Sequence, residues 1–166
     1  AGDTRLAMIG VDISKWAVLA AAKQDKQTRW VVGSNANLPI LNESLDLVLC
    51  LFGFPVYSEF SRVLRPGGQV IQVDAGADHL RELREIIYPE LKTPAHTKSS
   101  DPEGFRSLAS TVLRFSLRLP DQASIADLLA MTPHLYRASS EGLEKAAALE
   151  SLEVTVDVVL KCLEKR

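Results

Sequence analysis

The sequence predicts an α/β fold whose sheet is mostly parallel and closes with an antiparallel pair of strands near the C-terminus. The continuous apolar run beginning at Leu6 is typical of a strand buried on both faces, and residues 44–51 give the strongest strand signal in the chain. Segments with helical character alternate with these runs, which is the order that builds a parallel sheet through right-handed crossovers. A period-two segment at 112–119 and a final apolar run from Val154 predict the closing strands.

Composition limits the class of protein. A chain of 166 residues, 46% of them hydrophobic, suits one domain with a real core. The net charge of -2 is spread evenly, which does not fit a self-sufficient, strongly basic nucleic-acid binder. Cys50 and Cys162 lie in separate apolar runs, so we expect reduced core thiols in a cytoplasmic protein. No apolar run reaches the length of a membrane span.

In the first half, each element has its own local signal. Ser14 can cap an alanine-rich helix. Pro66 cannot continue a helix, and the two glycines after it permit a tight turn into the next strand. The expected strands are 6–11, 29–33, 44–51 and 69–74, the expected helices are 16–23 and 57–64, and a loop covers 35–39.

In the second half, the helical signals are amphipathic spacing and acidic or serine starts. Leucine and isoleucine recur at helical spacing in 78–91, Asp121 begins a helix that runs to Met131, and Ser139 or Ser140 caps another that ends at Leu149. Residues 92–104 are predicted to form a mobile loop. In 112–119 apolar residues alternate with arginine and serine, which predicts a half-buried strand, and 154–163 is the closing strand.

Three features in the first half have candidate chemistry. Asp12 ends a predicted parallel strand, where a carboxylate can accept two ribose hydroxyls; it also suits a helix cap or a surface acid. The loop at 33–39 can border an adenine, or be an ordinary polar turn. The strand at 45–51 leads into 52–55, and the carboxyl end of a central strand is where a ligand binds in an open α/β sheet. The alternative is that this segment is only a core strand and its loop.

The order of these features carries more information than any one of them. Asp12, the loop near 35, Leu45-Asp46-Leu47-Val48 and the run from Arg62 to Gly68 follow one another at characteristic distances. This order resembles class I S-adenosylmethionine-dependent methyltransferases after their first motif, over about residues 6–75. The resemblance implies a Rossmann-like sheet and S-adenosylmethionine as cosubstrate.

The remaining residues narrow the resemblance. His79-Leu80 with Glu82-Leu83, Ile87-Tyr88, Glu103-Gly104-Phe105 and Met131-Thr132-Pro133 are similar to segments of bacterial 23S rRNA guanine-N1 methyltransferases and their macrolide-resistance relatives. The resemblance then spans almost the whole chain. It implies methyl transfer to N1 of a guanine in 23S rRNA, with the rRNA as partner and a cytoplasmic location.

The resemblance also assigns site residues. Asp12 and Ile13 would hold the cosubstrate ribose, and Leu51 and Phe52 would line the sulfonium side. The adenine would be bordered by Ser34, Asn35 and Ala36. No residues of this chain are expected to bind a metal.

Guanine N1 carries a proton that must leave, so a base is useful. His79 and Asp74 are the candidates, and His79 also suits a helix start that makes only a local hydrogen bond. His96 falls in the predicted loop and is expected to be solvated. His134 follows Met-Thr-Pro and would face either the cleft or solvent.

The chain also departs from the family. The first strand, its glycine-rich loop and the zinc module at the N-terminus of the family are not found before Asp12. We therefore expect residues 1–166 to be the C-terminal portion of a catalytic domain, with 1–76 as the cosubstrate-binding half and 77–166 as the substrate-side half. As a truncated and inactive fragment it would expose strand edges, and we expect rearrangement or a homodimer.

Three other functions stay open. The first is a small-molecule methyltransferase, which would share the core. The second is a non-catalytic α/β fragment or binding module. The third is a dinucleotide-binding domain, against which the missing Gly-x-Gly-x-x-Gly run argues.

Overall fold

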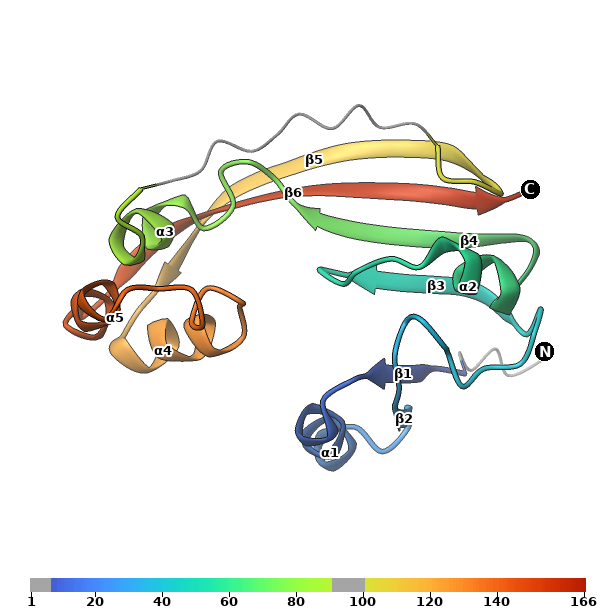
Figure 1. Ribbon diagram of the computed structural model, residues 1–166, viewed down its shortest axis with the longest axis horizontal. Helices are drawn as coiled ribbons and strands as arrows, with labels where there is room; N and C mark the ends of the chain where they lie inside the picture. The colour runs from blue at the N-terminus through green and yellow to red at the C-terminus, as the bar shows by residue number, and fades with distance from the viewer. Residues whose placement is uncertain (1–6, 91–100) are drawn as a thin grey trace, which may run out of the picture.

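The computed structural model describes residues 7–90 and 101–166, and Figure 1 shows how its elements are arranged. The strands are β1 (Ile9–Asp12), β2 (Arg29–Val32), β3 (Leu45–Leu51), β4 (Leu64–Ala75), β5 (Phe105–Leu119) and β6 (Leu152–Lys165). The helices are α1 (Lys15–Gln24), α2 (Tyr57–Val63), α3 (Arg81–Ile87), α4 (Gln122–Ala130) and α5 (Ser140–Ala147). The α/β class is confirmed, and each expected element is present.

The strands form two separate sheets in the described residues. One contains β1 and β2, paired in parallel, and the other has the order β3-β4-β6-β5. In the larger sheet β3 and β4 are parallel, whereas β6 runs antiparallel to both β4 and β5. The expectation of an antiparallel closing strand is therefore confirmed. The lower part of Figure 1 shows β1, β2 and α1 below the long strands of the larger sheet.

The expected burial of the strand at 6–11 is wrong, and the strand at 45–51 does not have the central position considered for it. The strand that ends at Asp12 is not buried on both faces, since Ile9 is 41% exposed. The strand at 45–51 is not central, because β3 lies at the edge of its sheet, and Leu49 and Leu51 are exposed. Both results have one cause: each strand has a neighbour on only one edge among the described residues.

The Arg65-Pro66-Gly67-Gly68 run differs in detail from the predicted turn. α2 ends at Val63 as expected, but the chain continues at once as β4. Leu45 pairs with Leu64 and Leu47 pairs with Gln69, so residues 65–68 bulge out of the ladder between the two pairs. Gly67 has φ of 75°, which is the left-handed backbone that glycine adopts without a steric penalty.

The helix expected at 78–91 is shorter in the structure and begins at Arg81. Leu80, the residue before it, has φ of 53° and donates its N–H to the carbonyl of Thr155 at 2.7 Å. Residues 76–80 are therefore fastened to β6 and are not free to extend the helix. Residues 91–100, which include His96 and most of the predicted loop, lie outside the described residues.

The strand expected at 112–119 is longer and less buried than its pattern suggests. β5 extends from Phe105 to Leu119, and its apolar residues Leu113, Phe115 and Leu117 are exposed. The alternation correctly indicates a strand, but the prediction of a half-buried strand is wrong. β5 is the outer strand of the sheet, and only its two ends are buried.

The caps of the later helices match their local chemistry. Asp121 accepts a hydrogen bond from the backbone N–H of Ser124 at 2.7 Å and begins α4. Ser139, not Ser140, caps α5, and it accepts the N–H of Gly142 at 3.0 Å. A side chain at Gly142 would overlap the backbone of Ile87, so this glycine permits the close approach of α5 to α3.

Two hydrophobic clusters hold the described chain together. One surrounds α2 and joins Phe60, Val63 and Val70 to Phe105 of β5, with Leu38 from the preceding loop. The other lies where α3, α4 and α5 meet the far end of β5 and β6. Cys50 is buried and, like Cys162, forms no disulfide, as expected. The candidate site lies between these clusters, at the carboxyl ends of β3 and β4.

Candidate functional site

Asp12 lies at the carboxyl end of β1, where it is exposed. Its carbonyl accepts the N–H of Gly33 at 3.0 Å, which joins the ends of β1 and β2. Its carboxylate oxygen Oδ1 accepts the N–H of Ser14 at 2.7 Å, and the Ser14 side chain caps α1. Ser14 and not Asp12 is therefore the helix cap, and Asp12 is a surface acid with one local contact. A carboxylate has four lone pairs and can still accept ribose hydroxyls.

The loop after β2 is tied to the loop after β3. The Ser34 hydroxyl accepts the N–H of Ala36 at 3.2 Å, which stabilises the turn. The Asn35 amide donates to the carbonyl of Phe54 at 3.0 Å. This contact brings the predicted adenine-side residues next to the predicted sulfonium-side residues, as one ligand spanning both would require.

Phe52 stands at the end of β3 in an unusual conformation. Its φ is 52°, which costs a non-glycine residue about 1–3 kcal/mol, and such strained residues cluster at functional sites. Its N–H donates to the carbonyl of Val73 at 2.9 Å, so the neighbouring strand fixes its position. The ring is 58% exposed and stacks on the His79 ring, with centroids 5.3 Å apart and planes 26° from parallel. Phe52 and His79 thus form one aromatic pair.

Arg62 fastens the loop between β2 and β3 to α2. One end of its guanidinium donates to the carbonyl of Ile40 and to Asn42, and the other donates to the carbonyl of Leu38. Glu59 pairs with the same guanidinium at 2.8 Å and accepts the N–H of Leu38. Sequence reasoning used Arg62 only as part of a turn motif and missed this contact to the candidate adenine-side loop.

We expect Glu59 to make stability depend on acid pH. The Arg62 side chain and the Leu38 N–H lower the pKa of Glu59 from 4.5 to about 2. A carboxylate with a lowered pKa in the folded state stabilises fully above the unfolded pKa, and this contribution is lost as pH falls from 4.5 toward 2. Urea unfolding should therefore show a difference between wild type and Glu59→Gln that is greatest above pH 5 and shrinks in acid. A difference that grows in acid would contradict this.

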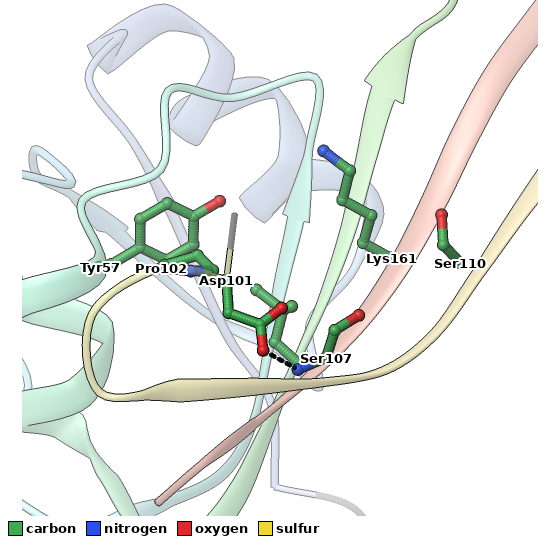
Figure 2. A pocket seen from close by; sticks show the side chains of 7 residues that line it. Tyr57, Asp101, Pro102, Ser107, Ser110 and Lys161 are labelled. Carbon is green, nitrogen blue, oxygen red and sulfur yellow. Dashed lines mark hydrogen bonds between the residues drawn. The ribbon is translucent and has the colours of Figure 1, made fainter. Parts of the chain in front are cut away.

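Asp74 forms hydrogen bonds with Gln72 and an ion pair with Lys161. Its two oxygens accept the Gln72 amide at 2.9 and 2.8 Å, and Lys161 lies 3.3 Å away. The buried Gln72 in turn accepts the hydroxyl of Tyr57 at 2.7 Å. This chain of contacts borders a small cavity of about 80 Å³, shown in Figure 2 with Tyr57 and Lys161 at its walls. The contacts favour a structural role for Asp74.

His79 lies in a loop that β6 holds. Asp157, buried in β6, accepts the Gly76 N–H with its carbonyl at 2.8 Å and the Asp78 N–H with its carboxylate at 3.0 Å. Its own N–H donates to Nδ1 of His79 at 3.3 Å. Arg84 donates to the carbonyls of Ala77 and His79 and closes the loop from the other side.

His134 contributes a second ring near this loop. Its Nδ1 lies 2.7 Å from the hydroxyl of Tyr88, and the two rings meet edge to face. Burial lowers the pKa of His134, and the charge of Arg84 lowers it further. His134 is therefore half-buried and held by the Tyr88 hydroxyl. It faces neither an open cleft nor bulk solvent, the two surroundings expected from the sequence.

Asp157 is the residue that sequence reasoning missed most clearly. A signal was present, because Asp157 is an acid inside the apolar run from Val154 to Leu160. A charged residue in a core strand usually has a defined partner.

Three arginines near the far strands and α3 are paired with acids. Arg81 pairs with Asp78 and Glu85, and Arg114 also pairs with Asp78. Arg106 pairs with Glu164. Within residues 7–90 and 101–166, no group of three or more acidic, histidine or cysteine side chains is placed to bind a metal ion. No helix in these ranges has the length and apolar character needed to cross a membrane.

Comparison with known proteins shows similarity to methyltransferases. Residues 2–72 match a family model described as a methyltransferase domain. The chain is 32% identical over 152 residues to YxjB of Bacillus subtilis, to which 23S rRNA (guanine-N(1)-)-methyltransferase activity is provisionally ascribed; the match covers 90% of the chain and 54% of YxjB. It is 29% identical over 155 residues to the 23S rRNA (guanine(748)-N(1))-methyltransferase of Streptomyces fradiae, covering 89% and 55%. The chain spans about half the length of these curated relatives.

Solved structures show the same fold. A SAM-dependent methyltransferase from Methanosarcina mazei superposes with a TM-score of 0.53 at 14% identity, covering 96% of the chain and 82% of that protein. The YcgJ protein of Bacillus subtilis gives 0.52 at 19% identity, covering 96% and 82%. The chain has the fold of SAM-dependent methyltransferases, and its residues 2–72 match the methyltransferase-domain family model. Its sequence is similar to 23S rRNA (guanine-N1)-methyltransferases.

Proposed function

We propose that this chain is the larger part of a catalytic domain that transfers a methyl group from S-adenosylmethionine to N1 of a guanine in 23S rRNA. The observation that supports this most is the grouping of Asp12, the Asn35 loop and Phe52 at one end of parallel strands, joined by the Asp12–Gly33 and Asn35–Phe54 hydrogen bonds. Ligands bind at that end of open α/β sheets. The two curated relatives support the choice of rRNA as substrate.

The residues present fit S-adenosylmethionine in chemical type. Asp12, with Ile13 beside it, offers carboxylate oxygens to the ribose hydroxyls. Ser34, Asn35 and Ala36 offer polar groups to the adenine edge. Leu51 and Phe52 present exposed apolar surface to the sulfonium side. The cosubstrate supplies an electrophilic methyl group, and the protein contributes mainly by holding it in line with guanine N1.

We expect Asp12→Asn to weaken cosubstrate binding by about 10- to 100-fold, because hydrogen bonds to a charged group are worth about 1.5–3 kcal/mol. The measurement is calorimetric titration of S-adenosylhomocysteine into wild type and variant, both made in a longer form of the protein that carries an upstream segment. Asp46→Asn is a control of the same chemistry, since Asp46 pairs with Arg65 on the exposed side of β3. Equal affinities for wild type and Asp12→Asn would refute the ribose assignment.

We also propose that a further strand and a glycine-rich loop complete the binding site between β1 and β3. The open edges and exposed apolar residues of β1 and β3 support this. The titration should then give much tighter binding for a longer form of the protein that carries an upstream segment. Tight binding to residues 1–166 alone would rule out this part of the proposal. A homodimer that covers the same edges would appear in size-exclusion chromatography.

The reaction itself is tested by incubating the longer form with 23S rRNA and S-adenosylmethionine. A methyl group on N1 blocks the pairing edge of guanine, so primer extension should stop at the modified base. Methylation of other positions, or none, would contradict the choice of guanine N1.

A further inference from the structure

The protonation of His79 is fixed by the loop that carries it. The N–H of Asp157 donates to His79 Nδ1, so Nδ1 must offer a lone pair. In a neutral imidazole one nitrogen accepts and the other carries the hydrogen, which places the His79 hydrogen on Nε2. A protonated ring would set an N–H at Nδ1 against the N–H of Asp157.

The charges around the ring agree with a neutral imidazole. Burial lowers the pKa of His79 below its usual value, and the Arg84 guanidinium adds to this effect. The Asp157 carboxylate and a backbone hydrogen bond with Asp157 oppose it, and the net shift is downward. His134 is the other titratable ring near the loop, and its pKa is also lowered by burial. At neutral pH the ring therefore presents an N–H donor at Nε2.

The ring also has a defined position relative to the site. It stacks on Phe52, the residue at the carboxyl end of β3, and Phe52 is held by the backbone of Val73. Arg84 and Asp157 hold the backbone of the His79 loop on either side. The donor is thus fixed beside the residue that we place on the sulfonium side of the cosubstrate.

We infer that His79 recognises the target guanine by donating Nε2–H to its O6, and that it is not the base that removes the N1 proton. This inference rests on the proposed function. Guanine presents an acceptor at O6, whereas adenine presents an amino donor at the same place, so the contact selects guanine. Phe52, partly exposed beside the ring, offers a face on which an extruded base stacks.

The same contact assists the reaction. The N1 electron pair forms a bond to the methyl carbon, the carbon–sulfur bond breaks and its electrons remain on sulfur, and the N1 proton leaves to water. Negative charge that develops on O6 as the proton leaves is stabilised by the fixed Nε2–H donor.

The first test needs no substrate. Long-range ¹⁵N–¹H correlation spectra of the 166-residue chain at pH 7 report which ring nitrogen of His79 carries the hydrogen. We expect the Nε2–H form, and a spectrum of the Nδ1–H form or of a protonated ring would overturn the inference. This result is independent of whether the proposed rRNA reaction is correct.

The second test compares two variants in the proposed longer form that carries an upstream segment. His79→Gln keeps an amide donor and cannot titrate, whereas His79→Phe keeps an aromatic ring without a donor. We expect kcat/KM for guanine-containing rRNA to stay within about 10-fold of wild type in His79→Gln. In His79→Phe it should fall about 10- to 100-fold, because guanine O6 is then a buried acceptor without a donor. Equal losses of kcat/KM in both variants would contradict the inference. So would a wild-type kcat/KM that rises with pH as a histidine deprotonates, if this rise is absent from His79→Gln, because His79 would then act as a base.

A control separates failure of the inference from failure of the proposed function. S-adenosylhomocysteine affinity should be unchanged in both variants, because neither alters the ribose or adenine contacts. If wild type methylates no rRNA guanine, the proposed function fails while the spectroscopic result still stands.

Discussion

Replacing Phe60 with alanine is expected to lower the free energy of unfolding by about 3–5 kcal/mol, the range for deleting a buried aromatic side chain. Phe60 is 2% exposed and packs in the cluster that joins α2 to β4 and to Phe105 of β5. Deletion leaves a cavity between elements that are far apart in sequence. Neighbours fixed in strands cannot close such a cavity completely. Urea unfolding followed by circular dichroism measures the effect.

Phe54 provides a matched control for this prediction. It is the same residue type six positions earlier, and its side chain is 91% exposed. Phe54→Ala should change the free energy of unfolding by no more than about 0.5 kcal/mol. If both substitutions cost the same, burial in this cluster is not what stabilises the fold.

The elements that sequence predicted well are those specified by local chemistry. Ser14, Asp121 and Ser139 each cap a helix through a side-chain oxygen that accepts a nearby N–H. Such a cap depends on a few adjacent residues, so the pattern alone suffices. Pro66 likewise marks the end of α2 within a few residues, because proline restricts the backbone wherever it occurs.

Burial could not be predicted in the same way. The apolar runs that became β1 and β3 indicate strands correctly, but their exposure depends on which strand lies next to them. The same holds for Phe115 in β5, where alternation indicates a strand but not what covers its apolar face. Neighbours in a sheet come from distant parts of the chain, and periodicity carries no record of them.

The candidate site was predicted in part for the same reason. Strand order places Asp12, the Asn35 loop and Phe52 at one edge, so their proximity followed from the predicted topology. The contacts of His79 did not, because Asp157 lies 78 residues away in sequence. Its proximity requires β6 to pair with β4, a register that no local signal specifies.

Replacing Gly76 with alanine is expected to disrupt the His79 loop. A side chain at Gly76 would overlap the buried carboxylate of Asp157, the group that holds the loop to β6. Overpacking of this kind costs about 1–3 kcal/mol. Because the loop carries His79, methyl transfer should fall while S-adenosylhomocysteine affinity is retained. Chemical denaturation and the ¹⁵N shift of His79 measure the two effects, and the exposed neighbour Ala77, changed to serine, is the control.

A double substitution tests whether the overlap with Asp157 is the cause. Asp157→Ala alone should also destabilise the protein, since it removes the acceptor of the Asp78 N–H. In combination with Gly76→Ala, however, it removes the group that the new methyl would meet. The combined loss should therefore be smaller than the sum of the single losses by about 0.5–3 kcal/mol, the range for residues in contact. Strict additivity would mean that Gly76 matters for a reason other than its contact with Asp157, and the account of how His79 is positioned would lose its main support.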